Sequence, residues 1–126
     1  TCLAIESSGD IVCAGSNDPY NIFLWSLKTG QLIDILNGHT GPISSVNFSG
    51  TNGMLTSSSW DQSVKIWDVF GKNGMVDSFG HSSEVIQSLF HPNSNDLITT
   101  TLGGQIFIWD QETNSIKGML ECKHDI

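Results

Sequence analysis

The chain has 126 residues, a size typical of one domain, and a formal net charge of −8 from 5 basic and 13 acidic residues. All the basic residues are lysines, which argues against a basic face that grips a nucleic-acid backbone. Only 14% of the residues are charged, so disorder is not expected, and no apolar run approaches the roughly 20 residues that span a membrane.

The cysteines and the start of the chain suggest a cellular context. Cys2, Cys13 and Cys122 are odd in number and contain no CxxC pair, which predicts neither a disulfide framework nor a zinc site. No signal peptide precedes them, so a reducing intracellular compartment fits best. Because the chain begins at Thr1 and not at Met, we expect it to be part of a longer protein.

Three tryptophans mark an internal repeat. Trp25, Trp67 and Trp109 lie 42 residues apart, and Gly38-His39 recurs at the same spacing as Gly80-His81. The spacing within the first unit differs by one extra residue between Asp18 and Ile22. Three units of about 42 residues therefore fill the chain without a linker, which predicts a repeat architecture.

Each unit predicts four short β-strands separated by hairpins rich in glycine, asparagine, serine and aspartate. In the middle unit these strands are Pro42–Ser49, Met54–Trp60, Ser63–Val69 and Met75–Phe79. Alternation in the third of them puts Val64 and Ile66 on one face and Lys65 and Trp67 on the other. Apolar residues do not recur at helical spacing over a long window, so few helices are expected.

This pattern resembles the WD-repeat family, whose units have four strands, Gly-His near the start and Trp-Asp near the end. The middle unit, GHTGPISSVNFSGTNGMLTSSSWDQSVKIWDV, carries the resemblance most fully. It implies an all-β fold of three WD-repeat blades, each a four-stranded antiparallel sheet, at residues 1–37, 38–79 and 80–126. Closed propellers have about four to eight blades. The three blades of this chain therefore imply an open partial β-propeller that is a fragment of a larger propeller.

Three polar residues of the middle unit permit two interpretations. His39, Ser57 and Asp61 are the residue types of a hydrolase triad. The resemblance implies instead a buried structural tetrad, in which these three and Trp67 bond to one another and fix the blade. We favour the tetrad because a nucleophile also needs an open cleft and an oxyanion site, and a buried Ser57 would exclude catalysis. Ser59 lies on the same strand face and could replace Ser57.

The outer units depart from the tetrad pattern. The first unit has Ala14 at the serine position, and its histidine position falls before Thr1. The third unit has Gly103 at the aspartate position and keeps a partial tetrad of His81, Thr99 and Trp109. Only the middle unit has the full set, so we expect the outer two blades to be less stable.

Trp60 lies off the 42-residue register of the three repeat tryptophans, at the end of a predicted strand and near a turn. The resemblance implies that this end of the second strand reaches the propeller's binding face. Trp60 is therefore the candidate partner-binding residue, because exposed tryptophans often carry binding energy. The alternative is that Trp60 packs within or between blades, as large aromatic side chains usually do.

Longer stretches resemble the periodic tryptophan proteins of the nucleolar small-subunit processome. The relevant segments are SSGDIVCAGSNDPYNIFLWSLKTGQLIDILNGHTGPIS, SSSWDQSVKIWDVF, GGQIFIWD and the ending ECKHDI. This resemblance implies a non-catalytic protein-interaction scaffold in the nucleus and nucleolus. The scaffold would act in processing of the small-subunit ribosomal RNA precursor and in pre-ribosome assembly.

The partners implied are other processome proteins and, through the complex, small nucleolar RNA and precursor ribosomal RNA. These blades would make little direct nucleic-acid contact, bind no membrane, and need no cofactor or metal. The alternative is a WD-repeat adaptor of another complex, such as a ubiquitin-ligase substrate receptor or a trafficking coat. Because three blades leave two open apolar faces, the isolated chain is expected to self-associate.

Overall fold

The computed structural model describes residues 2–6, 9–16, 20–49, 54–69, 74–91, 96–110, 113 and 115–121. In these ranges the regular structure consists of twelve β-strands, and no helix occurs that could cross a membrane. The first four strands are β1 (Cys2–Ile5), β2 (Ile11–Gly15), β3 (Ile22–Ser26) and β4 (Leu32–Leu36). The next four are β5 (Ile43–Phe48), β6 (Met54–Ser59), β7 (Ser63–Asp68) and β8 (Gly74–Gly80). The last four are β9 (Val85–Phe90), β10 (Asp96–Thr101), β11 (Gln105–Asp110) and β12 (Ser115–Glu121).

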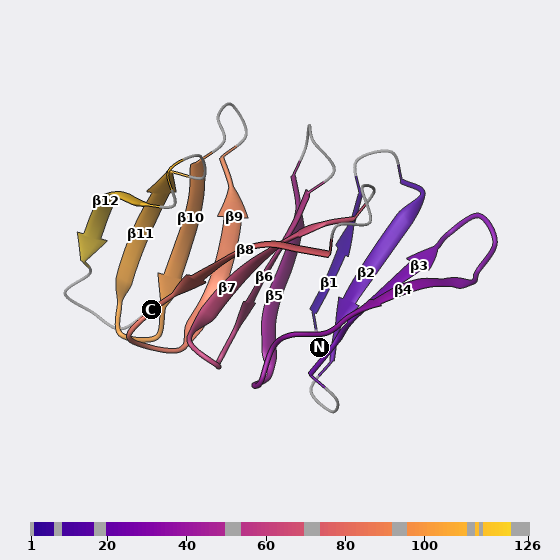
Figure 1. Cartoon of the computed structure of the whole chain (residues 1–126), viewed down its shortest axis with the longest axis horizontal. Helices are drawn as coiled ribbons and strands as arrows, with labels where there is room; N and C mark the ends of the chain where they lie inside the picture. The colour runs from indigo at the N-terminus through magenta and orange to yellow at the C-terminus, as the bar shows by residue number, and fades with distance from the viewer. Residues whose placement is uncertain are drawn as a thin grey trace.

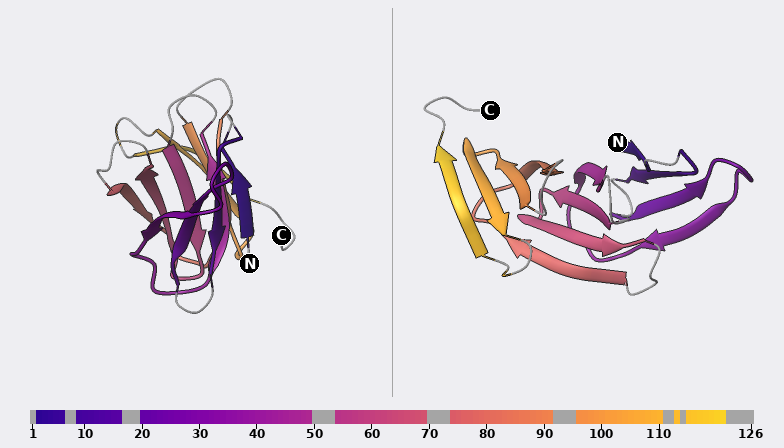
Figure 2. Two further views of the ribbon diagram at one scale, coloured as in Figure 1. Left: turned by 90° about the vertical axis from the view of Figure 1, so that its right-hand side faces the viewer. Right: turned by 90° about the horizontal axis from the view of Figure 1, so that it is seen from above.

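The strands form three separate four-stranded antiparallel sheets, each built from four consecutive strands (Figure 1). Seen from above, the sheets fan out in an open arc, with the first and third at its two ends (Figure 2). The prediction of an all-β fold with four strands per unit is therefore confirmed, and the arrangement is that of a partial propeller.

Two apolar clusters hold adjacent sheets together. The cluster between the first and second sheets consists of Cys13, Ile22, Leu24, Leu36, Ile43, Val46, Leu55 and Trp67. The cluster between the second and third consists of Val64, Ile66, Phe79, Val85, Leu97 and Trp109. The middle sheet is thus buried on both faces, because alternate residues of β7 enter different clusters, as the alternation of that strand predicts.

Polar contacts reinforce the junction between the second and third sheets, where the first strands β5 and β9 lie against each other. The Ser44 hydroxyl donates to the Val85 carbonyl at 2.7 Å, and the Asn47 side-chain amide donates to the Ser88 carbonyl at 2.8 Å. These bonds satisfy backbone groups at the sheet edges and fix the register of one sheet against the next.

Each sheet has a bulge at the same place, immediately before the repeat tryptophan. The pairing of the third and fourth strands shifts between Leu24 and Trp25, between Ile66 and Trp67, and between Ile108 and Trp109. A bulge increases local twist, so its recurrence gives the three sheets a common shape. The sequence repeat does not reveal this bulge, because the extra residue lies on the more variable fourth strand.

Candidate functional site

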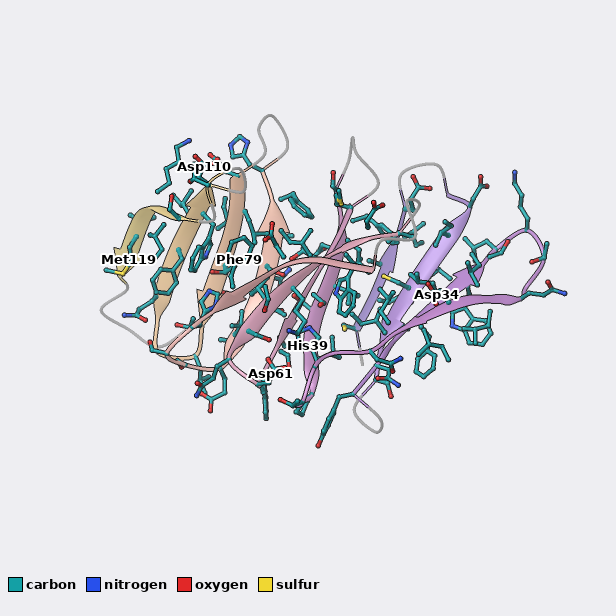
Figure 3. All side chains as sticks on the ribbon, viewed as in Figure 1. Asp34, His39, Asp61, Phe79, Asp110 and Met119 are labelled. Atoms are coloured by element: carbon teal, nitrogen blue, oxygen red, sulfur yellow. The ribbon has the colours of Figure 1, made fainter. Side chains whose placement is uncertain are left out.

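The polar residues of the middle unit lie together at one rim of the arc. His39 belongs to the connection between β4 and β5, and Asp61 to the turn between β6 and β7 (Figure 3). The His39 Nδ1 atom lies 2.9 Å from Asp61 Oδ2, and its Nε2 atom lies 2.6 Å from Ser57 Oγ. The Trp67 indole Nε1–H donates to the same Ser57 oxygen at 2.9 Å. The structure thus brings all four residues into one hydrogen-bonded network.

The partners of His39 fix the direction of this network. Since a carboxylate only accepts, Nδ1–H donates to Asp61, which leaves Nε2 to accept the proton of the Ser57 hydroxyl. Ser57 Oγ in turn accepts from Trp67. Burial lowers the pKa of His39, and this effect outweighs the opposing hydrogen bond and charge of Asp61. The imidazole is therefore neutral near pH 7, and its contact with Asp61 is a hydrogen bond to a carboxylate.

Asp61 is held by more donors than sequence reasoning identified. The backbone N–H of Thr40 donates to Oδ2 at 3.0 Å, and both the N–H and the hydroxyl of Ser63 donate to Oδ1. Burial raises the pKa of Asp61, but the bonds from Ser63, Thr40 and His39 outweigh it and leave the pKa lowered. Gly41 permits this close approach, since a Cβ there would lie 2.9 Å from the Asp61 nitrogen. The Asp-x-Ser spacing, a common side-chain turn, was the available signal for Ser63.

The network has the order of a hydrolase triad but cannot act as one. Ser57 has 0% of its surface exposed, and its oxygen already accepts the Trp67 indole. No substrate carbonyl can reach a hydroxyl in this position, so the catalytic interpretation of these residues is excluded. Ser59 does not replace Ser57, because its hydroxyl bonds to the carbonyl oxygens of Gly41 and Pro42 instead.

The third sheet contains a shorter version of the network. His81 Nε2 lies 2.8 Å from Thr99 Oγ1, and the Trp109 indole donates to that oxygen at 3.1 Å. With Gly103 at the aspartate position, His81 Nδ1–H donates to the Phe79 carbonyl at 3.2 Å. Burial lowers the pKa of His81, and the Phe79 bond opposes this only partly. The imidazole here is packed among aromatic rings, 5.4 Å from Phe107 and 5.2 Å from Trp109 between centroids.

The first sheet has no such network among its described residues. Ala14 offers no side-chain acceptor, and Trp25 is 40% exposed on the open face of the sheet. Asp18, which holds the aspartate position of the first unit, lies outside the described residues. The difference between Trp25 and the buried Trp67 follows from what covers each ring: Trp67 faces the first sheet, whereas no sheet of this chain faces Trp25.

Trp60 lies in the β6–β7 turn, beside the network but not in it. Its backbone N–H donates to the Pro42 carbonyl at 3.0 Å, while its side chain is 58% exposed. The ring therefore does not pack within or between these sheets. Leu102 holds the equivalent place in the third sheet and is 53% exposed.

Metal-ligand types do not gather in this site. Within the part of the chain that the structure describes, no group of three or more His, Cys, Asp or Glu residues is placed to hold a metal ion. Cys13 is buried, and burial raises the pKa of its thiol to about 12, which keeps it from being the thiolate that metals bind.

The lowered histidine pKa values predict that stability falls in mild acid. Below the ordinary histidine pKa of 6.5 the unfolded chain binds a proton that folded His39 does not, so stability is full above this pH and declines as the pH falls. The slope for His39 is at most about 1.4 kcal/mol per pH unit. The lowered pKa of Asp61 adds a further loss below its ordinary value of 3.8. Urea unfolding between pH 8 and pH 5 measures the slope.

The same measurement on His39→Gln identifies the source of the acid sensitivity. The variant is less stable at pH 8, but its stability changes less between pH 8 and pH 5, because one of the two imidazoles whose pKa burial lowers is gone. An equal slope in both proteins would contradict the assignment to His39.

Comparisons with known proteins agree with this geometry. The WD domain, G-beta repeat family matches residues 30–68 and 74–110. Periodic tryptophan protein 2 of Saccharomyces cerevisiae is 42% identical over 99% of the chain, and the Arabidopsis thaliana protein is 44% identical over 98%. The Periodic tryptophan protein 2 homolog of Schizosaccharomyces pombe is 39% identical over the whole chain. The chain spans only 14% to 15% of the length of these relatives.

The matched repeats are offset from the sheets by one strand. Residues 30–68 contain β4 together with β5, β6 and β7, and residues 74–110 contain β8 together with β9, β10 and β11. Each sequence repeat therefore begins on the last strand of one sheet and ends on the third strand of the next, so every repeat links two blades. With its repeats, sheets and relatives in agreement, the chain belongs to the WD-repeat family.

Proposed function

We propose that this chain forms three consecutive blades, at residues 1–37, 38–79 and 80–126, of a larger β-propeller in a non-catalytic ribosome-biogenesis scaffold. The observation that carries the proposal is the similarity to Periodic tryptophan protein 2 over 98% to 100% of the chain at 39% to 44% identity. Burial of Ser57 supports a scaffold, because it makes the His39, Ser57 and Asp61 set unable to act as a hydrolase triad.

The scaffold acts in the nucleolus, in processing of the small-subunit ribosomal RNA precursor and assembly of the pre-ribosome. Its partners are other processome proteins and, through them, small nucleolar RNA and precursor ribosomal RNA. The net charge of −8 favours protein contacts over RNA contacts for these blades.

Affinity purification of the tagged protein, with proteomics and RNA sequencing of the bound material, tests the proposal. Recovery of processome proteins, small nucleolar RNA and precursor ribosomal RNA is the expected result. Recovery of a ubiquitin-ligase or coat complex would overturn the proposed function, although the propeller fold would stand.

Trp60 is the residue we propose as a partner anchor, because it is 58% exposed and directly follows β6. Trp60→Ser is expected to lose one or more partners in the same purification while its melting temperature stays unchanged. The matched control is Leu102→Ser, which removes an exposed apolar side chain from the equivalent turn of the third sheet. Full partner recovery by Trp60→Ser would reject the anchor role.

The open faces of the first and third sheets predict self-association of the isolated chain. Leu3 and Ile5 on β1 are 67% and 59% exposed, and Leu120 on β12 is 59% exposed. Exposed apolar surface of this kind favours association. Sedimentation over a range of concentrations is expected to show oligomers that diminish in Leu3→Lys/Ile5→Lys. A clean monomer at high concentration would contradict this prediction.

A further inference from the structure

The two faces of each sheet differ in kind. The repeat tryptophan lies on one face, here called the tryptophan face, and the residues one and three places before it lie on the other, here called the aliphatic face. Leu24 on the aliphatic face of the first sheet shares an apolar cluster with Trp67 of the second. Ile66 on the aliphatic face of the second sheet shares another cluster with Trp109 of the third. Both junctions inside the chain therefore join an aliphatic face to a tryptophan face.

One face of each kind is left open, at opposite ends of the arc (Figure 2). The strand register shows that the open tryptophan face of the first sheet is apolar and includes Leu3, Ile5, Val12, Ala14, Phe23 and Trp25. It shows that the open aliphatic face of the third sheet includes Leu89, Ile98, Thr100, Ile106, Ile108 and Leu120. The acidic residues of this second face, Asp96 and Asp110, lie opposite each other at its end, and Asp96 pairs with Lys117 at 3.0 Å.

The outer strand of each sheet shows what the open aliphatic face lacks. Leu36, Phe79 and Leu120 each pair with the residue three places before the tryptophan of their own sheet. Leu36 and Phe79 are buried at the junctions, and the Phe79 ring lies 4.9 Å from the Trp109 ring of the next sheet between centroids. Leu120 is 59% exposed, because this chain has no further sheet to cover it. The missing neighbour is a tryptophan face, and Trp25 is the repeat tryptophan that is left exposed.

Side chains that meet at a junction also match in polarity. Between the second and third sheets, the Thr56 hydroxyl donates to the Ser88 hydroxyl at 3.2 Å. By the 42-residue spacing, Thr56 corresponds to Ile98 on the open aliphatic face. With the one extra residue of the first unit, Ser88 corresponds to Leu3 on the open tryptophan face. Both members of the polar pair are thus replaced by apolar residues, so a junction between the two open faces leaves no hydroxyl of this pair without a partner.

We propose that two copies of this chain join head to tail and close a ring of six sheets. Each copy lays the open aliphatic face of its third sheet on the open tryptophan face of its partner's first sheet. Leu120 then packs against the partner's Trp25, and Ile98 packs against the partner's Leu3. The contact continues the junctions inside the chain, and two copies that form it twice have no open face left. Three sheets from each copy make six, within the range of about four to eight for closed propellers, whereas three copies would make nine.

The ring belongs to the chain of 126 residues by itself, and its existence does not depend on the proposed function. In a larger propeller, flanking blades of the same polypeptide would cover both faces and compete with the second copy. Exposed apolar surface alone predicts association of any kind, whereas two matched faces predict one contact and one number of copies.

Sedimentation equilibrium of the chain tests the number of copies. The expected result is a dimer with twice the chain's mass of 13.7 kDa. Its mass is not expected to increase at higher concentration, because the closed ring has no open face. A monomer at high concentration would overturn the proposal, and so would a mass that keeps growing with concentration.

Two variants and their mixture test the direction of the contact. Leu3→Lys blocks the first-sheet face and Leu120→Lys blocks the third-sheet face, so each variant by itself is expected to be a monomer. An equimolar mixture is expected to regain a dimer with one copy of each, weaker than the original because only one of its two junctions is intact. A dimer of either variant by itself would mean that like faces pair and would reject the head-to-tail contact. A mixture that stays monomeric, although circular dichroism shows both variants folded, would reject it as well.

Met119→Lys is the matched control for Leu120→Lys. Met119 is the neighbouring residue of β12 and is 51% exposed, but it lies opposite Phe107 on the other face of the third sheet. This variant is expected to keep the dimer mass. If it loses the dimer as fully as Leu120→Lys does, the added charge on β12 is the cause, and the open aliphatic face is rejected as the contact.

Discussion

Asp61→Ala is expected to destabilise the chain by about 3 kcal/mol, because one side chain satisfies donors from three residues. His39 Nδ1–H and the backbone N–H groups of Thr40 and Ser63 all donate to this carboxylate, at distances of 2.9 to 3.0 Å. The Asp61 side chain is only 8% exposed, so water cannot fully replace these bonds in the folded state. Urea unfolding at pH 7.5, with the slope checked for two-state behaviour, measures the loss.

Two further variants show whether the loss of stability comes from the hydrogen bonds of the Asp61 carboxylate or from the removal of any acidic residue. Asp61→Asn keeps the shape and part of the accepting capacity, so its cost is expected to be smaller, about 1–2 kcal/mol. Asp34→Ala removes an exposed acid on β4 and is expected to change stability by less than about 0.5 kcal/mol. An unfolding midpoint for Asp61→Ala that equals that of Asp34→Ala would contradict a stabilising role for the network.

The sequence predicts the positions of the strands well, because the same pattern of residues occurs three times in the chain. The four strands expected in the middle unit, such as Ser63–Val69, differ from β7 (Ser63–Asp68) and its neighbours by at most one residue at each end. Turn residues and alternation act locally, so each copy of the pattern is independent evidence for the same strand. The bulge before each tryptophan is not predictable in this way, because it depends on how the fourth strand pairs.

The candidate site is likewise predictable where it depends on the repeat pattern and not where it depends on loop geometry or packing. The residue types of the network could be aligned between units, and the Asp-x-Ser spacing points to Ser63, but the Thr40 donor could not be predicted, since its contact depends on how its loop lies against the β6–β7 turn. The sequence also could not show that the Thr101 hydroxyl has no partner among the described residues, because the equivalent Ser59 hydroxyl, 42 residues earlier, bonds to the carbonyl oxygens of Gly41 and Pro42. The catalytic interpretation of Ser57 was excluded by its burial. That burial depends on packing between sheets that are about 40 residues apart in the chain, which the sequence pattern does not show.

Trp67→Phe is expected to cost about 2 kcal/mol, whereas Trp25→Phe is expected to cost less than about 0.5 kcal/mol. Trp67 is 3% exposed, and its indole is a donor to Ser57. A phenyl ring removes that donor and leaves a cavity in a cluster that holds two sheets together. Trp25 occupies the same repeat position, but it is 40% exposed, and its unit has Ala14 at the position of Ser57.

This pair of variants tests which contacts make the repeat tryptophan stabilising. The two positions are equivalent in the sequence repeat but differ in the residues that surround the ring. Urea unfolding of both variants at pH 7.5 gives the comparison, with indole fluorescence replaced by circular dichroism as the probe. If the network and the neighbouring sheet make Trp67 important, only its variant loses stability. Equal losses would instead mean that the ring stabilises its own sheet, through the bulge that precedes it, and that the hydrogen bond to Ser57 contributes little.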